Sequence, residues 1–101
     1  MMEVKLEPNL SHCIETVAKR EYEKVLSLIL GGKQEESLLD KLELLRLFLE
    51  SADLRQLRSR CEESLIAGKR VEVILTSAQG APPYEIEVKE AQSEDRGKSS
   101  T

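Results

Sequence analysis

The chain has 101 residues, of which 40% are hydrophobic and 34% charged, and its 19 acidic and 15 basic side chains give a net charge of -4 at pH 7. This length suits one ordinary domain with one core, and the composition excludes a disordered chain and a membrane protein. The acidic balance disfavours nucleic acid as a partner, because binding to a phosphate backbone depends largely on Lys and Arg side chains.

The chain shows no sign of export or membrane insertion. Residues 1–7 include acidic side chains and lack the apolar run of a signal peptide. The most apolar stretch, Leu38–Leu49, is interrupted by four charged residues and is too short to span a bilayer. We therefore expect a cytoplasmic protein that has no membrane segment.

A short strand is predicted at the beginning of the chain. Val4 and Leu6 alternate with charged residues, which is the period of a half-buried strand, and Pro8 ends the pattern. Such a strand could add to one edge of a sheet.

The first helix is predicted to begin at Asn9 or Ser11, both favourable N-cap residues, and to end at Leu30, where two glycines follow. Glu21 and Lys24 also project toward the apolar face of this helix, three residues apart, so an ion pair between them or a partly exposed position at the rim of this face is expected. At 100° per residue, this face contains Leu10, Ile14, Val17, Ala18, Val25, Leu28 and Ile29.

The second helix is predicted over Glu35–Glu50 and is apolar around most of its circumference, which is typical of a central helix. A heptad-like stripe is expected to face the core and contains Leu38, Leu42, Leu45 and Leu49. A second apolar group on the same helix contains Leu44, Leu47 and Phe48.

This second apolar group is the candidate interface. Two alternatives are open: the C-terminal hairpin covers the three side chains, or a second copy of the chain does. We expect the second alternative, a homodimer, because an exposed apolar patch usually marks an interface and twofold dimers are the commonest oligomers.

A third helix is predicted after a break at residues 51–53, where Asp53 and Gln56 have an approximate capping-box spacing. Gly68 is suited to end it. Its narrow apolar stripe contains Leu54, Leu57, Cys61 and Leu65. Alternatively, the second and third helices form one long helix with a kink near residue 51.

A β-hairpin is predicted next. On its first strand Val71, Val73 and Leu75 alternate with Glu72, Ile74 and Thr76. After the turn-rich residues 77–83, the second strand is expected to point Tyr84, Ile86 and Val88 inward and Glu85, Glu87 and Lys89 outward. Residues 90–101 are rich in Ser and charge, so they are expected to form a disordered tail after a single domain at 1–89.

No residue pattern indicates catalysis, a metal or a cofactor. The single histidine, His12, is expected to face solvent, and residues 31–33 lack the rest of a phosphate-binding loop. The two cysteines, Cys13 and Cys61, are far apart in the sequence and are predicted to be buried free thiols. We expect no enzyme activity.

The densest basic region offers an alternative function. Arg55, Arg58, Lys69 and Arg70 could contact nucleic acid, because three helices followed by a hairpin is the element order of a winged-helix domain. Acidic residues in the same region instead favour a solvent-exposed helix face on which basic and acidic side chains pair with each other.

The sequence therefore predicts an α+β fold in which three helices pack on a small antiparallel sheet formed mainly by the C-terminal hairpin. The preferred function is a noncatalytic protein-interaction or regulatory module that self-associates. The alternative is a winged-helix-like domain that binds nucleic acid.

Overall fold

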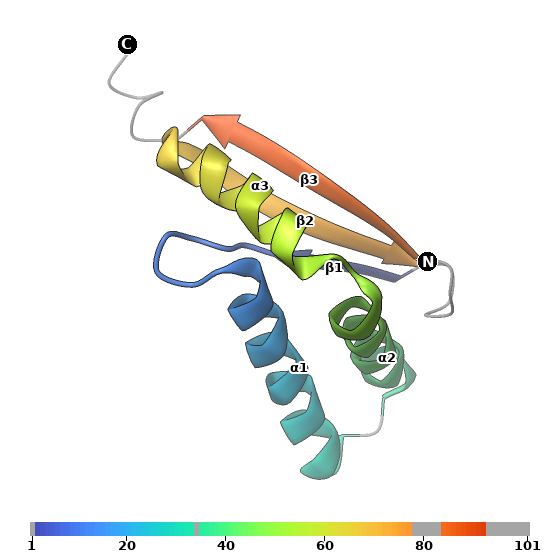
Figure 1. The fold of residues 1–101 in the computed structure, drawn as a ribbon. Coiled ribbons are helices and arrows are strands. Elements are labelled where there is room, and N and C mark those ends of the chain that lie inside the picture. Colours follow the sequence, from blue (N-terminus) through green and yellow to red (C-terminus); the bar gives the residue numbers. More distant parts are fainter. Residues whose placement is uncertain (1, 34, 78–83, 93–101) are drawn as a thin grey trace.

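The computed structural model describes residues 2–33, 35–77 and 84–92 (Figure 1). It confirms the predicted α+β class, with three helices and three strands in these ranges. In chain order they are β1 (Met2–Leu6), α1 (Ile14–Leu30), α2 (Glu36–Ser51), α3 (Leu54–Ile66), β2 (Lys69–Ser77) and β3 (Tyr84–Gln92).

The strands form one antiparallel sheet in the order β1-β2-β3, so the predicted N-terminal edge strand is confirmed. Strand β3 continues to Gln92, because the early start of β2 at Lys69 supplies a pairing partner for it. The expectation that disorder begins at residue 90 is therefore wrong for residues 90–92. Residues 93–101 lie outside the described part of the chain.

The helices and the sheet bury one shared core. Register pairs such as Val4 with Leu75 and Leu6 with Val73 place one face of the sheet in this core, where these side chains are at most 2% exposed. Helix α3 lies along the sheet and contacts β2, whereas α1 and α2 pack side by side at the β1 side (Figure 1). The helices therefore leave β3 as the outermost strand on the opposite side.

The beginning of α1 differs from the prediction. The Asn9 side chain accepts hydrogen bonds from the backbone N–H groups of Ser11 and His12, each at 2.8 Å. This local turn replaces the expected helix start, and α1 begins only at Ile14, with Cys13 as its N-cap residue. Asn side chains stabilise turns and N-caps by the same kind of hydrogen bond, so sequence alone did not separate the two.

The other helix ends agree with the sequence. Helix α1 ends at Leu30, and Gly32 adopts a φ of 109°. Asp53 caps α3 by accepting a hydrogen bond from the Gln56 N–H at 3.1 Å, and Gly68, with a φ of 87°, follows its end. Helices α2 and α3 are thus separate, which rejects the kinked-helix alternative.

Helix α2 turns a different face toward the core than predicted. Leu44, Leu45 and Phe48 are 0% exposed, whereas Leu47 is half-buried. The other members of the expected core stripe, Leu38, Leu42 and Leu49, are only partly buried. The candidate interface is therefore wrong for Leu44 and Phe48, because α2 packs against α1 and β1 and these elements enclose that face within one chain.

The ion pair of Glu21 also has a different partner. Its carboxylate binds Lys41 Nζ on α2 at 2.8 Å, not the expected Lys24, which is exposed on α1. The pair joins the two packed helices, since α1 and α2 lie side by side. Spacing along one helix could not reveal a partner on another.

Among the described residues, no helix combines the length and apolar character needed to cross a membrane.

Candidate interaction site at the open edge of strand β3

Strand β3 is a long edge strand. Strand β2 is paired on both sides, by β1 and by β3, whereas the described residues pair β3 on one side only, along its nine residues. The other edge strand, β1, has only five residues and contacts both α1 and α2. An unpaired strand edge presents backbone N–H and C=O groups that can pair with a further strand. The longer and less covered of the two edges is therefore β3.

The helix-facing side of β3 is incompletely covered. Ile86 lies opposite Leu75 in the register, yet Ile86 is 40% exposed and Leu75 is 0% exposed. Tyr84 and Val88 are partly buried against the core. The difference arises because α3 contacts β2 and leaves part of the neighbouring strand open.

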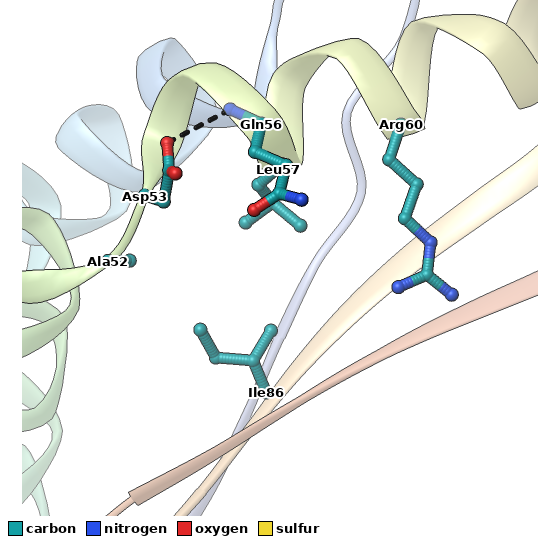
Figure 2. A pocket seen from close by; sticks show the side chains of 6 residues that line it. All are labelled: Ala52, Asp53, Gln56, Leu57, Arg60 and Ile86. Carbon is teal, nitrogen blue, oxygen red and sulfur yellow. Dashed lines mark hydrogen bonds between the residues drawn. The ribbon is translucent and has the colours of Figure 1, made fainter.

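A groove lies where α3 fails to cover β3. Its volume is about 330 Å³, and it is lined by Ala52, Asp53, Gln56, Leu57, Arg60 and Ile86. Figure 2 shows Ile86 extending from β3 toward α3, with Arg60 extending from the helix toward the sheet. Leu57 and Ile86 supply apolar surface to the groove, while Gln56 and Arg60 add polar groups.

Two hydroxyl groups connect the beginning of β3 to α2. Ser51 Oγ donates a hydrogen bond to the Leu47 carbonyl oxygen, 2.6 Å away. The Tyr84 hydroxyl lies 2.6 Å from the same Ser51 oxygen and therefore donates to it, since Ser51 has only one proton to give. This contact ties the beginning of β3 to the end of α2.

The Glu90 carboxylate connects the end of β3 to α3. It accepts a hydrogen bond from the Ser64 hydroxyl on α3 and pairs with Lys69 Nζ at 3.7 Å. The hydrogen bond from Ser64, assisted by the charge of Lys69, lowers the pKa of Glu90 from its usual value. The strand is therefore connected to helices near both of its own ends, with Ile86 between the two contacts.

The candidate nucleic-acid contacts largely pair with acids. Arg58 pairs with Glu62 at 3.5 Å, as its spacing predicted, and Lys69 pairs with Glu90. Arg70 Nη2 lies 3.3 Å from a Glu7 carboxylate oxygen. Arg55 and Arg58 line a separate hollow together with Glu15, Leu54, Ser59 and Glu62. Carboxylate groups thus lie among the basic side chains of this region.

The β3 groove could not be predicted from the amino-acid sequence. The alternation correctly placed Ile86 on the inward face of its strand, but incomplete cover by α3 is a tertiary property that alternation does not report. A weak signal existed, because charged residues such as Glu85, Glu87 and Lys89 are typical of edge strands. Ser51 and Ser64 lie on helices distant in sequence from their β3 partners.

The cysteines are free, and they differ in environment. Cys61 is 1% exposed, which confirms its predicted burial, and burial raises the pKa of its thiol. Cys13 is only half-buried, so the expectation of burial is wrong there. Its Sγ lies 3.4 Å from Thr16 Oγ1, and this hydrogen bond lowers the pKa of Cys13. In the described ranges, no three His, Cys, Asp or Glu side chains gather as a metal site would require.

We expect iodoacetamide to alkylate Cys13 faster than Cys61 in the native protein at pH 8. The reactive form is the thiolate, and Cys13 has both the lower pKa and the greater exposure. Peptide mass spectrometry over a time course measures both rates, and denaturation in guanidinium should bring them close together. Equal native rates would contradict the two environments.

Comparison with known proteins places the chain in a family. A protein-family model matches residues 2–94, and the chain belongs to that family. An uncharacterized protein from Archaeoglobus fulgidus is 46% identical in a 52-residue alignment, which covers 48% of this chain and 61% of that protein. The aligned part thus spans less than two thirds of that relative. No solved structure matches the chain.

Proposed function

We propose that the chain is a noncatalytic protein-interaction module that self-associates through the open edge of β3 and the adjacent groove. The observation that carries this proposal is the exposure of Ile86, at 40%, on the helix-facing side of a nine-residue edge strand. Backbone pairing along such an edge together with apolar contact beside it is a recurrent mode of protein recognition.

The residue types in the groove support binding rather than catalysis. The Asp53 carboxylate is engaged as the N-cap of α3, and the remaining polar groups lining the groove come from Gln56 and Arg60. An apolar floor with a polar rim is typical of protein interfaces. The proposal therefore assigns the groove to a protein partner.

The alternative, a nucleic-acid-binding domain, has less support. Arg58, Lys69 and Arg70 each lie within ion-pair distance of a carboxylate. A phosphate would have to compete with these acids, and the net charge of -4 adds general repulsion.

A single substitution in the groove tests the proposed function. We expect Ile86→Glu to convert a wild-type dimer into a folded monomer, because a charge would replace the exposed apolar side chain beside the pairing edge. The measurement is light scattering after size exclusion, in which the dimer has twice the 11.4 kDa chain mass. Circular dichroism reports whether the variant is folded.

Ile66→Glu is the matched control, because Ile66 is 76% exposed at the end of α3 and does not line the groove. This variant should remain dimeric. A wild type that stays monomeric at millimolar concentration would contradict the proposed function, as would a folded Ile86→Glu protein that dimerises as strongly as the wild type.

A further inference from the structure

We propose that two copies of this chain pair antiparallel along β3 with their twofold axis at Val88, so that Glu87 of each copy faces Lys89 of the other. The inference rests on the proposed function and specifies the partner, the register and the charges. The resulting sheet would have six strands, with all helices on one face.

The symmetry of a homodimer restricts the possible registers. When two identical antiparallel strands pair about a twofold axis at one residue, positions equally far before and after that residue lie opposite each other. Directly opposite side chains project to the same side of a sheet. A register centred on a residue therefore places the helix-facing sides of the two copies on the same side of the joined sheet. A register centred between two residues would instead place the apolar face of one copy beside the charged face of the other.

Val88 is the best centre for length and for charge. It is the midpoint of Tyr84–Gln92, so all nine residues of the strand take part in the pairing. Val88 then meets its own copy on the helix-facing side. On the outer side, Glu87 meets Lys89 of the second copy twice, which gives two favourable cross-strand pairs.

The neighbouring registers match less well. Centring on Ile86 would place Glu85 opposite Glu87 twice, and fewer residues would pair. Centring on Glu87 or on Lys89 would place that charge opposite its own copy. Like charges directly opposite each other destabilise a sheet, so charge complementarity selects the Val88 register.

The β2 residues opposite Glu87 and Lys89 within one copy are compatible with the Val88 register. Glu87 is exposed and lies opposite the apolar Ile74 on β2, so its own sheet offers it no directly opposite charge. Lys89 is exposed and lies opposite Glu72. In the proposed dimer, Glu72, Lys89 and Glu87 of the second copy would lie next to one another on three neighbouring strands. The charges on the outer face of the sheet would therefore alternate in sign from strand to strand.

Pairing would also change the groove. The second copy's β3 would lie beside the strand that carries Ile86, on the side where no other strand of the described residues pairs with it. Val88 of the two copies would then meet at the twofold axis, and Ile86 of each copy would lie opposite Glu90 of the other and diagonal to its Val88. One copy of α3 would flank the strand pair on each side. The groove and the open edge thus belong to one interface.

Charge reversal tests the register. Glu87→Lys and Lys89→Glu each turn two attractive pairs into two repulsive pairs, so each variant alone should self-associate about tenfold more weakly. An equal mixture of the two should recover wild-type affinity as a heterodimer, because each lysine then faces a glutamate. Sedimentation velocity measures the affinities, and native mass spectrometry with one variant ¹⁵N-labelled identifies the heterodimer.

Glu85→Lys is the matched control on the same face. In the Val88 register residue 85 lies opposite Ala91, so this change should alter the affinity less than twofold, whereas a Glu87-centred register would place it opposite Lys89. A dimer that mixing fails to restore, or that Glu85→Lys disrupts as strongly, would overturn the register and leave self-association standing. A monomeric wild type would instead overturn the proposed function itself.

Discussion

Replacing Phe48 with alanine is expected to lower the free energy of unfolding by about 3–5 kcal/mol. The side chain is 0% exposed and is among the largest that are fully buried in the described part of the chain. Its helix packs against both α1 and β1, so truncation leaves a cavity where several elements meet. Urea unfolding at one fixed protein concentration measures the effect, because the stability of a dimer depends on concentration.

Leu47→Ala is the control for Phe48→Ala. Leu47 is the neighbouring residue on α2 and is only half-buried, so its truncation should cost about 1 kcal/mol or less. The comparison also separates two accounts of α2. Equal losses for the two variants, or dissociation of a dimer by Leu47→Ala, would favour an interface on this helix and contradict the structure.

Ile74→Ala is expected to cost about 2–5 kcal/mol, although its side chain is on the face of the sheet opposite the helices. Ile74 is 3% exposed at the centre of the central strand, and Lys5 and Glu87 lie opposite it on the two neighbouring strands. The aliphatic stems of long charged side chains can cover apolar surface while their charges remain in water.

Thr76→Ala gives the comparison on the same face of β2. Thr76 is two residues further along the strand and is half-buried, so its loss should be about 1 kcal/mol. The measurement is again urea unfolding at fixed concentration. A loss for Ile74→Ala no larger than that for Thr76→Ala would show that this face contributes little to stability.

The sequence predicted local features well. Period-two alternation located β2 and β3, and the glycine at 68 and the cap at Asp53 marked helix ends that the structure confirms. Each of these features depends on residues adjacent in the chain. Local physical chemistry was therefore sufficient for the fold class and for most element boundaries.

Tertiary arrangement could not be predicted in the same way. Helix α2 has two apolar arcs, and its sequence does not state which arc meets α1 and β1. The ion pair of Glu21 with Lys41 likewise depends on the packing of two helices. The exposure of Ile86 depends on where α3 crosses the sheet, and the inward alternation of β3 contains no information on that position.

Pairing through β3 would also limit the assembly to two copies. The pairing would use the β3 edge of both chains and leave the two β1 edges at the ends of the extended sheet. Each β1 strand is short and contacts α1 and α2, so it offers a poor template for further strands. The proposed interaction therefore forms a closed dimer rather than a growing fibril.

The most direct test of self-association through β3 is an isotope-filtered NOE experiment on an equal mixture of ¹³C-labelled and unlabelled protein. The account predicts intermolecular NOEs between Val88 of one copy and Val88 of the other, and between Glu87 and Lys89. A mixture with no intermolecular NOEs at millimolar concentration, or with NOEs confined to α2 residues such as Leu47, would contradict the account.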